Sequence, residues 1–277
     1  MAPLLTTAFC PPVEYFAVLA RYSSVYMEAC ENYVKQSWRN RCRILTANGP
    51  MDLTVPVSHR SGEGQVSEDA SLTLGPTACA VPPLTMPRVA RSSEACPSPD
   101  RKITEVRVDY STPWVAKFER AVESAYYSSP FFIYYKDALW EILDSHPPTL
   151  WELNGRLTAF FCEKIGIAPQ IIETAEFIPP GDKAPSAVSL RSTPPPAEPA
   201  VPPLSVPRVA AASGPLSLGG MDLREVIHPK RKNTILADLG LDRPYWQVFR
   251  ERFGFVPGMS IMDLLFNEGP ESICWLR

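Results

Sequence analysis

The sequence has little of what several large protein classes require. Its 277 residues include only 14 glycines and three histidines. No segment has the roughly 18 consecutive apolar residues of a membrane-spanning helix. Neither a glycine-rich phosphate loop nor a GxSxG nucleophile turn occurs. The sequence therefore predicts no membrane span, and it offers no standard phosphate loop or serine nucleophile motif.

Charge of one sign is also scarce, because the formal net charge is −3 with 21% charged residues. Without an overall basic field, nucleic acid is not the expected main partner. The opening segment lacks the basic start of a signal peptide, since its first cation is Arg21, and Pro11, Pro12 and Glu14 interrupt it. We therefore interpret it as part of the folded protein.

The cysteine and histidine content indicates which cellular compartment to expect and whether a metal site is expected. The seven cysteines are odd in number and show no paired spacing, which is typical of reduced thiols in a cytoplasmic protein. His59, His146 and His228 have no cysteine or histidine partner at metal-binding spacing. We predict no metal site and no cofactor.

Proline is abundant, but it is concentrated in two segments. Seventeen of the 31 prolines lie in residues 76–99 and 179–215. Each segment carries one copy of a related motif, VPPLTMPRVARSS at 81–93 and VPPLSVPRVAAAS at 201–213. The flanks of the two copies differ, so a true repeat architecture is not indicated. We expect two disordered insertions, at 76–100 and 179–218, although a partner-binding polyproline ligand is an alternative.

The rest of the chain forms three blocks that we expect to pack as a single domain over residues 1–277. The N-terminal block is strand-rich, and the middle and C-terminal blocks are helical, which predicts an α/β or α+β fold. Asn48-Gly49 predicts a type I′ hairpin turn, and Ser260 with Asp263 predicts a capping box. Helices are expected at 13–20, 114–125, between Pro130 and Ser145, at 150–165, at 245–253 and after Ser260; strands are expected at 25–28, 41–45, 52–57 and 103–108.

The densest group of polar residues is CENYVKQSWRNRCRI, at 30–44. If residues 39–44 form a strand, Arg39, Arg41 and Arg43 share one face and Asn40 lies on the other. Three guanidiniums on one face suit a phosphate or carboxylate, and a solvated outer face is the alternative. A buried Asn40 needs hydrogen-bond partners, so it either orders a site or ties the hairpin.

One cysteine is a weaker candidate. Cys10 precedes Pro11-Pro12, where a nucleophile at a strand end is conceivable. Its sequence neighbours supply no base, so a packed thiol is the favoured interpretation.

Several stretches together resemble the WbqC-like protein family. They are PPVEYFAVLA, YVKQSWRNRCRI followed by NGPMDLTVPV, ITEVRVDYSTPW, SAYYSSPFFIYY and YWQVFRERFGFVPGMSIMDLLFNEGP, in family order. The long proline-rich segments depart from the family, and Cys10 stands where an aromatic is expected. The family pattern maps onto Pro12, Tyr15, Phe16, Lys35, Trp38, Asn40, Arg41, Gly49, Pro56, Trp114, Tyr126, Asn267, Glu268 and Gly269.

The resemblance implies a cytoplasmic role in bacterial O-antigen or other surface-polysaccharide biosynthesis. A transfer of an acyl or aminoacyl group to a nucleotide amino sugar is one such activity. On this hypothesis Lys35 and Arg41 neutralise the phosphate of a nucleotide sugar or a carrier-bound acyl donor, and Asn40 orients a reacting group. Glu14, Glu31 or Glu268 is then the candidate general base. Tyr15, Trp38, Arg39 and Asn267 complete the expected substrate-binding residues.

The alternative hypothesis is a non-catalytic protein of the same pathway that binds an anion or sugar nucleotide, or acts as a scaffold. The sequence leaves the reaction, the substrate and the oligomeric state open.

Overall fold

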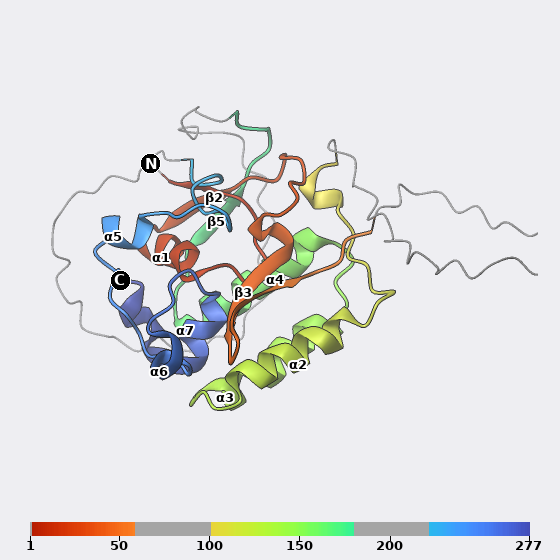
Figure 1. Ribbon diagram of the computed structural model, residues 1–277. Helices are drawn as coiled ribbons and strands as arrows, with labels where there is room; N and C mark the ends of the chain where they lie inside the picture. The colour runs from red at the N-terminus through yellow and green to blue at the C-terminus, as the bar shows by residue number, and fades with distance from the viewer. Residues whose placement is uncertain (1, 59–100, 180–221) are drawn as a thin grey trace, which may run out of the picture.

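The computed structural model describes residues 2–58, 101–179 and 222–277 (Figure 1). These residues form helices and two small sheets, which confirms the predicted mixed α/β class. Both VPPL motifs, and nearly all of the two predicted insertions, lie outside the described residues. In the described part of the chain, no helix is long and apolar enough to cross a membrane.

A parallel sheet of three short strands joins distant parts of the sequence. Its order is β1 (Leu4–Leu5), β2 (Ser24–Met27) and β5 (Gln170–Glu173). Leu4 pairs with Tyr26, and Val25 pairs with Ile171. Helix α1 (Val13–Arg21) connects β1 to β2, and its residues from Val13 to Leu19 are all buried. A helix buried on every side is a central element of the core, and here it includes a glutamate.

The predicted hairpin is confirmed, but its turn differs from the prediction. Strands β3 (Arg41–Thr46) and β4 (Gly49–Thr54) pair antiparallel, with Thr46 opposite Gly49. The two-residue loop is therefore Ala47-Asn48, and the positive φ falls on Gly49, at 106°. A type I′ turn needs positive φ at both loop residues, which the described backbone does not have there, so the predicted turn type was wrong.

The middle block contains three long helices, α2 (Trp114–Tyr126), α3 (Phe132–Asp144) and α4 (Leu150–Ile165), as the periodicity predicts. Thr149 caps α4 by accepting the N–H of Glu152, and Gly166 ends it in the left-handed conformation. The strand predicted at 103–108 was wrong. A 3₁₀ helix, η2 (Ile103–Glu105), occupies its first half, and only isolated bridges at Arg107 and Val108 follow.

The last block contains α5 (Ile235–Asp238), α6 (Arg250–Phe253), α7 (Ile261–Glu268) and the 3₁₀ helix η3 (Gly269–Trp275). Of the helix predicted at 245–253, only the last four residues are helical in the structure. The Ser260 hydroxyl caps α7 through the N–H of Met262. The Asp263 carboxylate completes no capping box, because it accepts hydrogen bonds from Tyr245 and Gln247.

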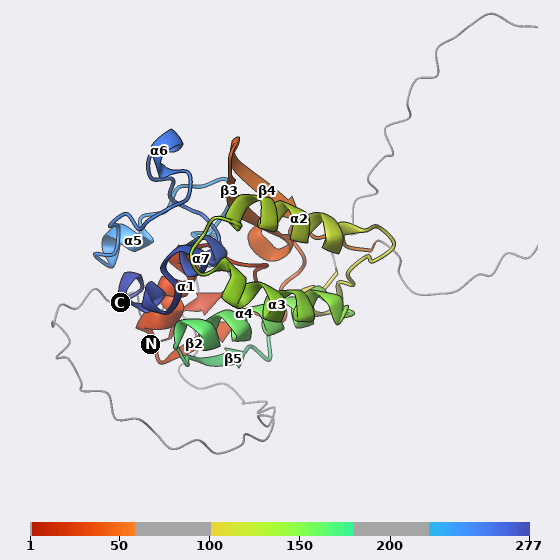
Figure 2. The ribbon, with the colours of Figure 1, turned by 90° about the horizontal axis from the view of Figure 1, so that it is seen from below.

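The blocks close around α1 and α7. Figure 2 shows α2, α3 and α4 layered on one side of the molecule, with the β3–β4 hairpin beside α2. On the other side, α5 and the C-terminal end gather near α1 (Figures 1 and 2). The chain at Met259–Ile261 crosses the start of α1, where the N–H of Val13 donates to Met259 and the N–H of Ile261 donates to Pro11. This crossing fixes the first turn of α1, from which the candidate site is built.

Candidate functional site

A pocket of 520 Å³, here called the basic pocket, opens at the first turn of α1. Its apolar and neutral walls include Pro12, Trp38, Asn233, Pro257 and Gly258. Its titratable lining residues are Glu14, Arg43, His228, Lys230, Arg231 and Lys232. Four permanent cations around one carboxylate make the pocket electropositive, which favours an anionic ligand.

The cations come from two parts of the chain. Arg43 lies on β3, where its guanidinium makes two hydrogen bonds to Asp52, at 2.7 and 3.2 Å, and lies over the Trp38 ring. The other three cations are consecutive in the segment before α5. Lys230 donates to the Gln36 amide oxygen, and no ion pair to Lys230 or Lys232 occurs within the described residues. The charges of Lys230 and Lys232 are therefore available to a ligand, whereas Arg231 pairs with Glu225 at 3.4 Å.

Glu14 is the acidic group of this pocket. The residue is 7% exposed, and its Oε2 has no hydrogen-bond partner among the described residues. Burial raises the pKa of its carboxyl, while its own backbone N–H acts in the opposite direction. A buried, unpartnered carboxylate destabilises the fold, so such a group is a functional candidate.

Gly258 keeps the space beside this carboxylate open. Its φ is 73°, a conformation that glycine adopts without strain, and a Cβ there would lie 3.8 Å from Glu14 Oε1. A larger side chain would extend into the pocket wall, next to the carboxylate.

His228 supplies a neutral polar group to the same pocket. Its Nδ1 accepts the N–H of Lys230, so Nε2 carries the hydrogen of the neutral ring. Burial lowers the pKa of His228, and nearby Arg231, Arg39 and Lys230 lower it further, against the opposite effect of Glu225. The ring is therefore a neutral hydrogen-bond donor near pH 7.

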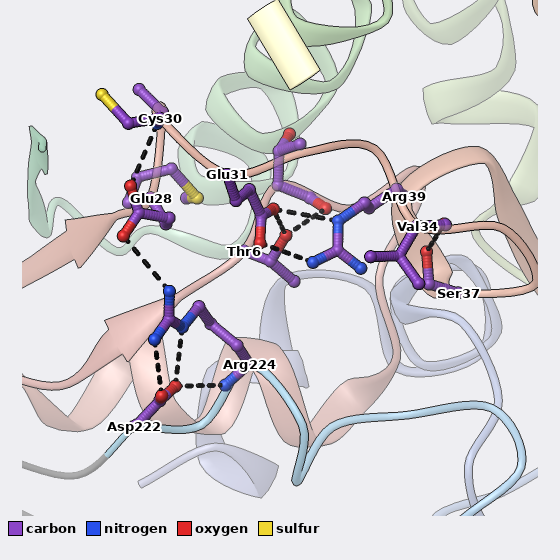
Figure 3. Close-up of polar contacts among 12 residues, drawn as sticks. Thr6, Glu28, Cys30, Glu31, Val34, Ser37, Arg39, Asp222 and Arg224 are labelled. Carbon is purple, nitrogen blue, oxygen red and sulfur yellow. Dashed lines mark hydrogen bonds and ion pairs between the residues drawn. The ribbon is translucent and has the colours of Figure 1, made fainter. Parts of the chain in front are cut away.

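A second polar cluster lies at the end of β2 and is fully paired (Figure 3). The Arg39 guanidinium donates to Glu31 at 2.9 and 2.6 Å, and the Thr6 hydroxyl also donates to Glu31. Arg224 binds Asp222 and the buried Glu28 in the same region. Because each guanidinium is neutralised by carboxylates, this cluster holds the chain together and leaves little charge for a ligand.

Arg39 does not share a strand face with the other arginines. Trp38–Asn40 form the 3₁₀ helix η1, and β3 begins only at Arg41, so the guanidinium of Arg39 turns inward to Glu31. The predicted face of three arginines was therefore wrong. Arg41 and Arg43 do lie on one face of β3, near Asp52.

A third cluster is fully enclosed beside α7. Tyr245 and Gln247 donate to Asp263 Oδ2, at 2.6 and 2.7 Å. Burial raises the pKa of Asp263 to about 6, although these donors and the Tyr126 hydroxyl favour the ionised form. The capping-box pattern assigned Asp263 to the start of the helix, and no sequence signal pointed to its partners 16 and 18 residues away.

A comparison with known families identifies the chain. The model of the WbqC-like protein family matches residues 7–73 and 90–193, which is more than half of the sequence. The chain belongs to the WbqC-like protein family. It is also similar to "Uncharacterized protein Rv1507c" of Mycobacterium tuberculosis, with 25% identity over 264 residues, covering 95% of this chain and 91% of the relative. No solved structure matches.

Four residues that the sequence analysis of this WbqC-like chain named as site or family-pattern positions line the basic pocket: Pro12, Glu14, Trp38 and Arg43. Lys35 is exposed, and neither it nor Arg41 is among the lining residues of the pocket. Sequence reasoning considered His228 only as a metal ligand, and it missed the run Lys230–Lys232. Three consecutive cations directly after a His-Pro pair were the available signal.

The other predicted site residues of this WbqC-like chain have structural partners. The Tyr15 hydroxyl donates to the carbonyl of Thr6 within the core, at 2.9 Å. Asn40 Nδ2 donates to the Val55 carbonyl at 2.9 Å, so Asn40 ties the start of β3 to the chain after β4. Asn267 Nδ2 donates to the carbonyl of Asp263 at 2.7 Å.

Glu268 is the last residue of α7, whereas Glu14 lies on α1, whose start is next to the first turn of α7. Glu268 Oε1 accepts the N–H of Trp246 at 2.9 Å. The eight residues of α7 span about 12 Å, so the two carboxylates are separated by most of the helix. Among the three predicted bases, Glu14 is the one that lines the basic pocket without a protein partner for Oε2.

Cys10 is a packed thiol. It is completely buried, with φ of 40°, next to Cys42. Burial, followed by the neighbouring Cys42, raises the pKa of the Cys10 thiol. A buried, protonated thiol is a poor nucleophile, which agrees with the interpretation favoured from sequence.

Proposed function

We propose that this WbqC-like protein is a cytoplasmic group transferase of surface-polysaccharide biosynthesis, such as O-antigen biosynthesis. It binds the phosphates of a nucleotide amino sugar in the basic pocket, and Glu14 acts as general base. The observation that carries this proposal is the buried Glu14 oxygen without a protein partner, beside a pocket ringed by cations. The family resemblance supplies the pathway.

The phosphate groups would contact Lys230, Arg231 and Lys232, which precede α5 in one exposed segment. Arg43 is partly neutralised by Asp52, so it adds less charge but offers a planar edge held by Trp38. Arg231 likewise pairs with Glu225, so Lys230 and Lys232 are the two lining cations without an ion pair among the described residues. Two such charges match a dianionic diphosphate, whereas a neutral sugar alone gains nothing from them.

Glu14 would take a proton from the amino group of the sugar. As that nitrogen attacks the carbonyl carbon of an acyl thioester, a C–N bond forms, the C–S bond breaks and the thiolate leaves. The proton lost by nitrogen passes to the Glu14 carboxylate. A carboxyl whose pKa is raised by burial is a stronger base than an exposed glutamate, which suits it to this step.

The phosphate part of the proposal is tested with inorganic pyrophosphate by titration calorimetry. Lys232→Ala should weaken binding about tenfold, because one charge-assisted contact is lost. Lys117→Ala, which removes an exposed lysine of α2, is the matched control and should bind as the wild type does. Equal affinity of all three proteins would contradict a phosphate site here.

The catalytic part is tested by incubating protein, nucleotide amino sugar and acyl thioester, with mass spectrometry of the products. Glu14→Gln should keep pyrophosphate binding and lose about 10²-fold or more of the rate. The wild-type rate should fall as the pH is lowered through the raised pKa of Glu14, since the base must be ionised. Binding without turnover by the wild type would instead support the non-catalytic alternative.

A further inference from the structure

A second pocket borders Glu14 and is apolar. Its volume is 210 Å³, and it is here called the apolar pocket. Glu14, Asn233 and Pro257 line both pockets, so the carboxylate lies where the two walls meet. The other walls are the aliphatic and aromatic side chains of Val13, Leu236, Leu241, Tyr245, Phe255 and Trp275.

Three polar residues at the rim are already engaged within the protein, whereas the exposed Asp242, which also lines the pocket, has no hydrogen-bond or ion-pair partner among the described residues. Asn233 Oδ1 accepts the N–H of Ile235, and the Thr234 hydroxyl donates to Asp238 at 2.8 Å. Arg243 donates to the carbonyl of Cys274 and stacks over Trp275, 4.6 Å from the ring centroid. Asn233, Thr234 and Arg243 therefore offer few free hydrogen bonds to a ligand.

The aromatic side chains that line the apolar pocket are also held in place by contacts within the protein. The Tyr245 hydroxyl donates to Asp263 at 2.6 Å, away from the solvent, because Tyr245 is buried. Its ring meets Phe255 edge to face at 5.1 Å and Trp275 at 6.3 Å. The wall is rigid and presents carbon, which fits a group without polar atoms.

We infer that the apolar pocket binds the acyl chain of a short-chain acyl thioester, with the carbonyl end directed to Glu14. This inference rests on the proposed function, because it names the second substrate of the same base. A volume of 210 Å³ is below the range of about 300–1,000 Å³ typical of whole ligands, so the pocket takes one small portion of a donor. A nucleobase fits less well, because most of the lining is carbon and, among the described residues, only the carboxylates of Glu14 and Asp242 are free to bond its polar edge.

The experiment measures binding of acetyl, butyryl and hexanoyl thioesters of N-acetylcysteamine by titration calorimetry. Each buried methylene strengthens binding about fourfold, so butyryl, with two more methylenes, should bind about 15-fold more tightly than acetyl. Ala237→Trp places a large ring on α5 at the pocket and should abolish this gain. Ala116→Trp, at an exposed site of α2, is the matched control and should leave the gain unchanged.

The result separates the two proposals. Pyrophosphate binding that persists together with equal affinity for all three thioesters would overturn the acyl pocket and leave the phosphate site standing. Chain-length preference without pyrophosphate binding would support the acyl pocket and contradict the proposed function. Uridine or adenosine could instead displace the butyryl thioester from the wild type and fail to bind Ala237→Trp. That result would assign the pocket to a nucleobase and overturn the inference.

Discussion

Nη2 of Arg39 lies 2.6 Å from Oε2 of Glu31, and the two side chains are only 3% and 7% exposed. Two residues that the sequence placed among the substrate-binding and catalytic groups thus neutralise each other in the interior. A buried pair of this kind does not strongly favour folding over apolar packing, but removing one partner leaves an uncompensated charge. The pair therefore acts as a constraint on the chain around η1.

The first prediction concerns this pair. Glu31→Gln should lower the free energy of unfolding by about 3–5 kcal/mol, because it leaves the Arg39 guanidinium buried without its counter-charge. Asp52→Asn is the control, since it breaks the Arg43 pair at the surface and should cost about 1 kcal/mol or less. Urea denaturation measures both, and equal losses would contradict the assignment of Arg39 to a buried structural pair.

The second prediction concerns Gly269, at the end of α7. Its φ is 56°, and a Cβ there would lie 2.5 Å from the ring of Phe131. Gly240 has a similar φ of 69° but open space around it. Gly240→Ala should cost about 1–2 kcal/mol from backbone strain alone. Gly269→Ala should cost about 1–3 kcal/mol more, because its φ of 56° and ψ of −131° suit glycine alone and because the Phe131 ring must move. Thermal unfolding of both variants provides the test, and similar losses would contradict the close packing at Phe131.

Sequence patterns located the elements that are locally determined. Helix α4 was predictable because Thr149 and Gly166 mark its ends and its apolar residues recur at helical spacing. The parallel sheet was not predictable as a unit, because β1 has only two residues and β5 pairs with β2 across more than 140 positions. Such pairing depends on tertiary packing rather than on local preference.

The candidate site was also predictable only in part, because some of its residues come together through long-range contacts. Glu14 and Trp38 were named from sequence and line the basic pocket. The alternation rule failed at Arg39, because the 3₁₀ turn before β3 shifts the direction of each side chain. The segment Lys230–Lys232 joins the pocket through a long-range approach to Gln36, which no local pattern encodes.

The third prediction concerns the thiols. Cys10 and Cys42 are completely buried, whereas Cys274 is exposed. N-ethylmaleimide added to the native protein should modify Cys274 well before Cys10, and it should reach Cys10 only as fast as the structure opens, because the buried thiol is both inaccessible and protonated. Peptide mass spectrometry over time follows each site. Modification of Cys10 as rapid as that of Cys274 would reopen the nucleophile hypothesis.

The last prediction concerns Asp263, whose pKa burial raises from 3.8 to about 6. Between these values the folded protein holds a proton that the unfolded chain has released, so this group makes stability fall as the pH rises from about 4 to 6. A pKa raised by about two corresponds to about 3 kcal/mol in the free energy of unfolding.

In Asp263→Asn the amide oxygen can still accept hydrogen bonds from Tyr245 and Gln247, but the side chain no longer ionises. The difference in unfolding free energy between variant and wild type should therefore grow in favour of the variant from pH 4 to pH 7. Denaturation in guanidinium chloride at both pH values measures it, and a difference independent of pH would show that Asp263 titrates as an ordinary carboxyl.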